Sequence, residues 1–162
     1  MRRTAKEFFD AVQYASQDAE RCRLQLEALE KNAAFGSSAG MGERVSGGGG
    51  NKVERRVVSY VGQEERLEQR RARDFAFIDR ACVVLYGPDQ QGGGGLCKAS
   101  PKMASVWADV LWWRYCANAS WDVVADAVGY TARPCQEFNR RALAWIDRYR
   151  FMSEIIDADD LY

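Results

Sequence analysis

The chain has 162 residues, enough to bury a core, and its length favours one compact module with an appendage over two large domains. Its 23 basic and 23 acidic residues give a formal net charge of zero, which excludes a uniformly basic nucleic-acid-binding body. Only three prolines, with glycine gathered in two clusters, are typical of an all-α fold with long helices.

Residues 1–86 are predicted to form a long, coiled-coil-like helical hairpin. The first helix should cover residues 4–35, since Thr4 and Glu7 have the spacing of a capping box. Its apolar positions then repeat at alternating spacings of four and three, which predicts a heptad seam. The seam consists of Phe8, Val12, Ala15, Ala19, Cys22, Leu26, Leu29 and Ala33.

The two helices of this hairpin are expected to be joined by a flexible connector at residues 36–50, which is rich in glycine and serine. The second helix is expected from Asn51 to about Tyr86, and its middle carries alternating acids and bases that suit a solvated face. Its approximate heptad consists of Val53, Val57, Tyr60 or Val61, Leu67, Ile78, Cys82 and Leu85. The side chains expected to approach the C-terminal module are Phe75, Phe77, Ile78 and Cys82.

The glycine-rich segment 87–99 is predicted to be a second flexible joint. Ser100 and Pro101 then predict a helix start, with serine as the cap and proline in the first helical position, and this helix should run to about Cys116. It opens the C-terminal module, residues 100–156, and an acidic tail at 157–162 is expected to fray.

The end of this module has the pattern of a helix-turn-helix. An incoming helix is predicted to start at Ser120 and to bury a face made by Trp121, Val124, Ala125 and Val128. Gly129 can adopt positive φ and stop this helix, and Thr131 can cap the next one after almost no loop.

The outgoing helix, which begins at Thr131, is predicted to have two different faces. Its inner face should consist of Cys135, Phe138, Ala142, Trp145, Ile146 and Tyr149. Its outer face carries Arg133, Gln136, Glu137 and Arg140, with Arg141 and Arg148 on the flank. Arginine can read guanine and glutamine adenine, so this face suits the major groove of double-stranded DNA, although a solvated helix face has the same composition.

The C-terminal module resembles that of phage and prophage transcriptional regulators of the ArpU and RinA kind and, more distantly, region four of sigma factors. The similarity lies in Leu111, Arg114-Tyr115, Ser120-Trp121, Val124-Ala125, Gly129-Tyr130-Thr131 and Arg141-Ala142-Leu143. Thr131 and Cys135 depart mildly from the family pattern, and Pro134 departs more because it can tilt or shorten the start of the helix. The resemblance extends weakly, as an order of elements, through the N-terminal two-thirds.

The sequence gives no positive reason to propose catalysis, a cofactor, a metal site or a small-molecule substrate. It contains no histidine, which removes the usual general base and the commonest zinc ligand. Its five cysteines are scattered and are expected to be reduced thiols. No apolar run suits a membrane span and the N-terminus does not resemble a signal peptide, so a cytoplasmic protein is expected.

Three functions are compatible with this pattern. The leading hypothesis is a phage-derived transcriptional regulator in which Arg133, Gln136 and Arg140 face base edges while Arg141 and Arg148 contact phosphates. The N-terminal helices would then mediate self-association or contact with RNA polymerase. The alternatives are an assembly or packaging protein, similar to a small terminase subunit, and an adaptor whose arginine face binds an acidic protein.

Overall fold

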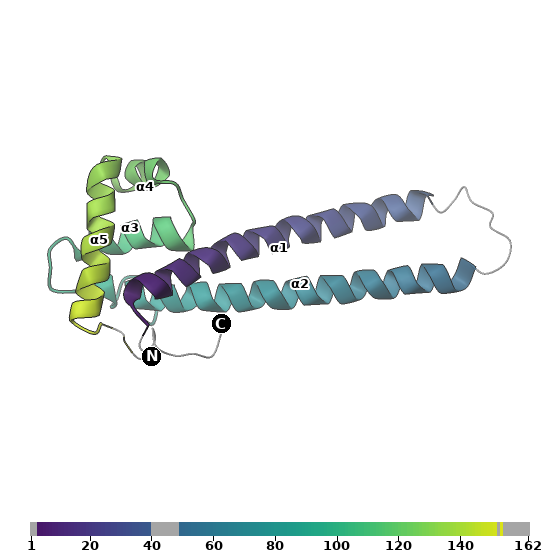
Figure 1. The fold of residues 1–162 in the computed structure, drawn as a ribbon, viewed down its shortest axis with the longest axis horizontal. Helices are drawn as coiled ribbons and strands as arrows, with labels where there is room; N and C mark the ends of the chain where they lie inside the picture. The colour runs from purple at the N-terminus through teal and green to yellow at the C-terminus, as the bar shows by residue number, and fades with distance from the viewer. Residues whose placement is uncertain (1–2, 40–48, 152, 154–162) are drawn as a thin grey trace. The chain divides into compact units, whose positions relative to one another are not determined.

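The computed structural model describes residues 3–39, 49–151 and 153, and every regular element in these residues is helical (Figure 1). The elements are α1 (Ala5–Ala39), α2 (Gly49–Tyr86), the 3-10 turn η1 (Leu96–Lys98), α3 (Ala104–Leu111), the π turn η2 (Trp112–Cys116), α4 (Trp121–Val128) and α5 (Ala132–Arg148). The predicted all-α fold is therefore confirmed. None of the described helices is long and apolar enough to cross a bilayer.

The chain divides into two compact units. Unit 1 consists of Met1–Gln17 and Asp74–Tyr162, and unit 2 consists of Asp18–Arg73. Both long helices run slightly further than predicted, to Ala39 in α1 and from Gly49 in α2. Most of the predicted connector, residues 40–48, lies outside the described residues, as does the predicted acidic tail.

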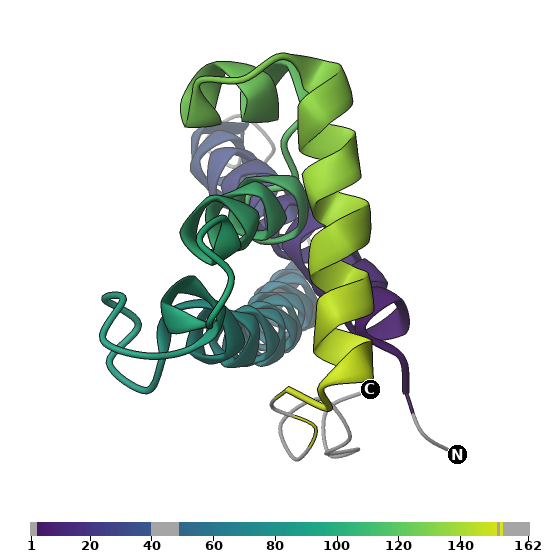
Figure 2. The same ribbon diagram turned by 90° about the vertical axis from the view of Figure 1, so that its left-hand side faces the viewer.

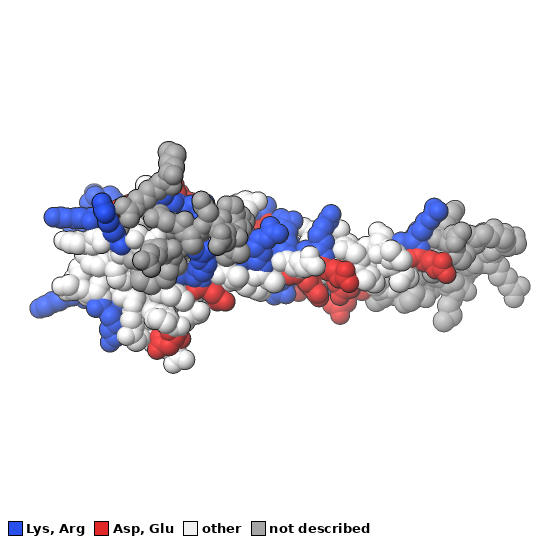
Figure 3. All heavy atoms as spheres, turned by 90° about the horizontal axis from the view of Figure 1, so that it is seen from below, with Lys and Arg blue, Asp and Glu red and all other residues white. Residues whose placement is uncertain are grey.

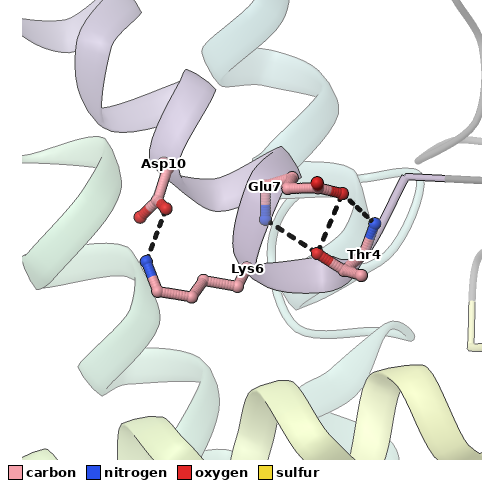
Figure 4. A network of polar contacts seen from close by, with 4 residues as sticks. All are labelled: Thr4, Lys6, Glu7 and Asp10. Atoms are coloured by element: carbon pink, nitrogen blue, oxygen red, sulfur yellow. Dashed lines mark hydrogen bonds and ion pairs between the residues drawn. The ribbon is translucent and has the colours of Figure 1, made fainter.

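The N-terminus of α1 is closed by the capping box that the sequence predicts (Figure 4). The backbone N–H of Glu7 donates to Thr4 Oγ1 at 3.2 Å, and the N–H of Thr4 donates to Glu7 Oε2 at 2.7 Å. These reciprocal bonds satisfy amides that have no partner within the helix. The backbone N–H of Thr4 and then its hydroxyl, which both donate to the Glu7 carboxylate, lower the pKa of that carboxyl. In the same turn, Lys6 forms an ion pair with Asp10, with Nζ 2.5 Å from Oδ2.

Unit 2 is a pair of antiparallel helical stretches from α1 and α2. Among its described residues, those that are buried are Asp18, Ala19, Cys22 and Leu67. The Asp18 carboxylate accepts hydrogen bonds from Nε of Arg70 at 2.6 Å and from Nη2 of the same guanidinium, so its charge is buried with a partner.

The predicted heptad seam is confirmed at its start and weakens along the hairpin. Ala19 and Cys22 are buried, Leu26 and Leu29 are half-buried, and Ala33 is exposed. On α2 the predicted seam is confirmed at Leu67, which is buried, and at Tyr60, the alternative to Val61, which is half-buried. It is wrong at Val57, which is 56 % exposed, and the neighbouring Val58 and Val61 are 72 % and 47 % exposed.

Unit 1 contains the main hydrophobic core, which gathers the start of α1, the end of α2, α3 and α5 (Figure 2). Phe8 packs on Phe9 and Phe77 with ring centroids 5.1 Å and 5.4 Å away, and Phe9 packs on Tyr115 at 5.5 Å. Burying each of these rings stabilises the fold by roughly 2–3 kcal/mol. The predicted approach of Phe77 to the C-terminal module is thus confirmed, as it is for Ile78 and Cys82, whereas Phe75 is 46 % exposed.

Residues 87–99, predicted to be a flexible joint, form a closely packed loop instead. The carbonyl of Tyr86 accepts hydrogen bonds from the N–H groups of Gly92 and Gly94, and Leu96 is fully buried. Gly95 has φ +74°, and a Cβ there would lie 2.6 Å from the backbone nitrogen of Gly87. The glycines permit two backbone segments to touch, which is a different use of glycine from chain flexibility.

The third helix also begins later than predicted. It starts at Ala104, with Met103 in the capping position, while Ser100 and Pro101 lie in the preceding turn. The Pro101 carbonyl accepts a hydrogen bond from Ala104 at 3.0 Å, so the proline belongs to a turn outside the helix. The helix continues from Trp112 as the π turn η2, which ends at Cys116, where the helix was predicted to end.

Candidate nucleic-acid interface

The corner between α4 and α5 has the predicted geometry of a tight helix-turn-helix (Figure 2). Ser120 caps α4 by accepting a hydrogen bond from the N–H of Val123 at 3.4 Å. Gly129 ends it with φ 78° and ψ 26°, and the N–H groups of Gly129 and Tyr130 both bond to the Ala125 carbonyl. Glycine adopts this left-handed conformation at little cost, so only residues 129–131 separate α4 from α5.

A second hydrophobic cluster joins α3, α4 and α5. Val110, Val124 and Cys135 are fully buried, and Ala125 is 6 % exposed. Phe138 packs against this cluster and also against the main core of unit 1, and Tyr130 contacts its ring edge-on at 5.0 Å. The three helices therefore form one packed module, which confirms the predicted inner face of α4.

Thr131 occupies the N-cap position of α5 with φ −83° and ψ 166°, but its hydroxyl makes no capping hydrogen bond. The predicted position of the cap is confirmed, and the side-chain cap is not formed. Pro134 is the third residue of the helix, where an N–H has no partner within the helix, so α5 still begins at Ala132 and is not shortened.

The inner face of α5 largely follows the prediction. Cys135, Ala142 and Ile146 are buried, and Phe138 and Trp145 pack against the main core. Tyr149 was expected in this face but is 56 % exposed, because α5 ends at Arg148 and Tyr149 is its C-cap. Leu143, which the predicted face does not include, is 7 % exposed.

The outer face of α5 is open. Thr131, Arg133, Gln136, Arg140, Arg141 and Arg148 are exposed, and Glu137 is half-buried. Six of these seven predicted residues lie on the first three turns, whereas Arg148 lies on the last, about 12 Å along the helix axis from Arg140. The described residues of unit 1 therefore leave this polar face of α5 exposed.

Glu137 organises the charges on this face. Its carboxylate accepts from Arg140 Nε at 3.0 Å and Nη2 at 2.6 Å, and from Arg141 Nε at 2.8 Å. These bonds, first to Arg140 and then to Arg141, lower the pKa of Glu137 to about 2. Within the described part of the chain, Arg133 makes no such ion pair, so its charge faces solvent.

Arg114 is a supporting residue that the predicted site does not include. Its guanidinium lies 4.7 Å from the centre of the Trp121 ring and donates from Nη1 to the Ala119 carbonyl at 2.9 Å. The start of α1 holds the same loop, since Ser16 donates to the Cys116 carbonyl at 2.8 Å. These contacts hold the segment that leads into α4. From the sequence, only the spacing of Arg114 and Trp121 could have indicated them.

Both signs of charge occur along the long helices on the face seen in Figure 3. The chain as a whole has a formal net charge of zero, so the excess of arginine on α5 is a local feature of that helix. An exposed helix of this kind can offer guanidinium and amide donors to nucleic acid or to an acidic protein. Comparisons of the chain with family models, curated proteins and solved structures found no match.

Proposed function

We propose that this chain is a sequence-specific DNA-binding transcriptional regulator of phage or prophage origin, acting in the cytoplasm and without catalysis. The observation that supports this most strongly is the exposed polar face of α5, which follows α4 after a turn of three residues that starts at Gly129. A rigid helix held at such a corner is the usual means of entering the major groove. The family resemblance of the module supports the same function.

The proposed contacts divide into two kinds. Arg133, Gln136 and Arg140 point their donors at base edges in the groove, where they specify sequence. Arg141 and Arg148, on the flank of α5, contact phosphates, and the exposed hydroxyl of Thr131 is placed to do so at the helix start.

Selection of bound fragments from random duplex DNA tests this function. A regulator enriches one sequence, and the spacing of repeated half-sites reveals its symmetry. With the recovered duplex, Arg141→Ala should lower the slope of log affinity against log salt by about one, whereas Arg133→Ala should weaken discrimination at one base position. No binding to any duplex would favour the adaptor hypothesis.

The exposed apolar residues of α2 favour a second candidate, an assembly protein that uses DNA contact only secondarily. Val57, Val58 and Val61 lie together on unit 2 and are each at least 47 % exposed. Such a patch is typical of self-association. Light scattering of the full chain distinguishes the two functions, since a ring-sized oligomer supports packaging and a monomer or dimer supports regulation.

A further inference from the structure

We infer that Glu137 sets the sequence specificity of α5 by competing with DNA for Arg140 and Arg141. This inference rests on the proposed function and adds a role for an acidic residue in the middle of a basic face. The carboxylate is the acceptor for three N–H groups from two guanidiniums.

The competition follows from which atoms are engaged. Arg140 uses the edge formed by Nε and Nη2, at 3.0 Å and 2.6 Å, to grip both oxygens of Glu137. A guanidinium that reads guanine O6 and N7 also presents two parallel N–H groups. Arg140 must therefore give up this pair, or turn its other edge outward, before it can read a base.

Exposure makes the exchange feasible. The side chains of Arg140 and Arg141 are 71 % and 60 % exposed, and that of Glu137 is 39 % exposed. An ion pair in water at this exposure is weak, so a well-placed bidentate acceptor can displace it. A single loosely placed phosphate gains less from the same guanidinium and is repelled by the carboxylate as well.

Glu137 consequently penalises non-specific DNA more than a matched site. When α5 enters the groove, the DNA phosphates repel the negative charge of Glu137, and DNA brings no positive charge to compensate. The one favourable contact open to it is an exocyclic amino group, of which cytosine N4 is the usual donor to a carboxylate. A preferred site should therefore place a cytosine amino group beside the guanine read by Arg140.

Glu137→Gln tests this role, because it keeps the shape of the side chain and removes the charge. Affinity for a duplex of random sequence should rise on the order of fivefold, with a salt slope steeper by about one as a guanidinium is released to a phosphate. Affinity for the duplex recovered by selection should rise less or fall. The ratio of affinity for the selected duplex to affinity for the random duplex should therefore decrease. A purely structural role of Glu137 would leave this ratio unchanged.

Asp79→Asn is the matched control, since Asp79 is exposed on α2 and the substitution changes the net charge equally. An equal gain in both variants would mean that net charge alone matters and would overturn the inference. Binding by the wild-type chain with no change in Glu137→Gln would also overturn it while leaving the proposed function intact. Binding of no duplex by either protein would overturn both. Circular dichroism of each variant establishes that the helices are retained.

Discussion

Asp147 ties the outgoing helix of the helix-turn-helix to the start of the chain. Its Oδ1 accepts a hydrogen bond from the backbone N–H of Ala5, the first residue of α1, at 2.7 Å. An amide at this position has no acceptor within its own helix, so the carboxylate caps α1 from 142 residues away and also meets the positive end of its dipole. One side chain thereby links two elements of the main core of unit 1.

We expect Asp147→Ala to lower the free energy of unfolding by about 1 kcal/mol, because the Ala5 amide loses a charged acceptor. Urea denaturation followed by circular dichroism measures the loss. Asp126→Ala, at an exposed position on α4, is the control and should change stability little. Equal stability of the Asp147 variant and the wild-type chain would mean that water replaces the carboxylate at no cost.

The thiols of Cys82 and Cys116 interact with each other where the end of α2 meets η2. A hydrogen bond from Cys116 lowers the pKa of the Cys82 thiol to about 7, and the same interaction together with burial raises the pKa of Cys116. Burial alone raises the pKa of Cys135. The half-buried Cys82 is thus the thiol best placed to react as a thiolate near neutral pH.

Alkylation by iodoacetamide should reach half of its maximal rate at Cys82 near pH 7, because the thiolate is the reacting form. Peptide mass spectrometry at a series of pH values follows each cysteine separately. Cys116→Ala should move this midpoint toward that of an ordinary thiol. Modification of Cys97 or Cys135 ahead of Cys82 would contradict the proposed interaction.

Two glycines perform different tasks at the element scale. Gly129 needs its positive φ to end α4, although a Cβ there would meet no atom within 4 Å. Gly95 needs a positive φ and also the space, since a Cβ would lie 2.6 Å from the Gly87 nitrogen and 2.7 Å from the Leu85 carbonyl carbon. Backbone strain therefore acts alone at the first position and together with a backbone clash at the second.

Gly129→Ala should destabilise the fold by roughly 1–2 kcal/mol, the cost of a left-handed alanine, and Gly129→Asn by less. Gly95→Ala should cost more than Gly129→Ala because the loop must also move apart. Thermal unfolding of the three variants orders these losses. A milder effect at Gly95 would show that the loop at residues 87–99 yields easily and is closer to the predicted flexible joint.

Elements that depend on neighbours in sequence could be predicted. Thr4 with Glu7, Ser120 and Gly129 each act within a few residues, and the faces of α4 and α5 follow from helical spacing. Elements set by distant partners could not. The pairing of Ala5 with Asp147 and the close contact of Gly87 with Gly95 have no local signal, and the late start of α3 follows from a proline used in a turn.

The outer face of α5 could be predicted from the sequence, because the residues opposite its buried inner face must be exposed. All seven predicted residues lie on α5 or at its N-cap. Their mutual contacts were outside the reach of sequence, since Glu137 has arginines at both three and four residues further along the helix. Helical spacing allows either pair, and the structure contains both.

At the scale of the whole molecule, the two units differ in how much they bury. Unit 1 contains two hydrophobic clusters, whereas the described residues buried in unit 2 are Asp18, Ala19, Cys22 and Leu67. Helices gain most of their stability from packing rather than from propensity. Unit 2 should therefore open at a lower free energy than unit 1.

Native-state hydrogen exchange should show faster exchange for amides of unit 2 than for α3 and α5, with Leu67 and its neighbours the slowest within unit 2. Mass spectrometry of peptides after timed exposure to deuterated water measures this difference. Protection in unit 2 equal to that of unit 1 would contradict the expectation. It would also indicate that Val57, Val58 and Val61, exposed in the single chain, are buried in an oligomer.

If the outer face of α5 enters a DNA groove, titration of isotope-labelled protein with the selected duplex will show it directly. Backbone amide resonances should shift most between Thr131 and Arg141, with a smaller effect at Arg148. Arg133→Ala with Arg140→Ala should remove these shifts while the helical signal is retained. Shifts confined to α1 and α2, or none at any duplex concentration, would mean that the outer face of α5 does not bind DNA.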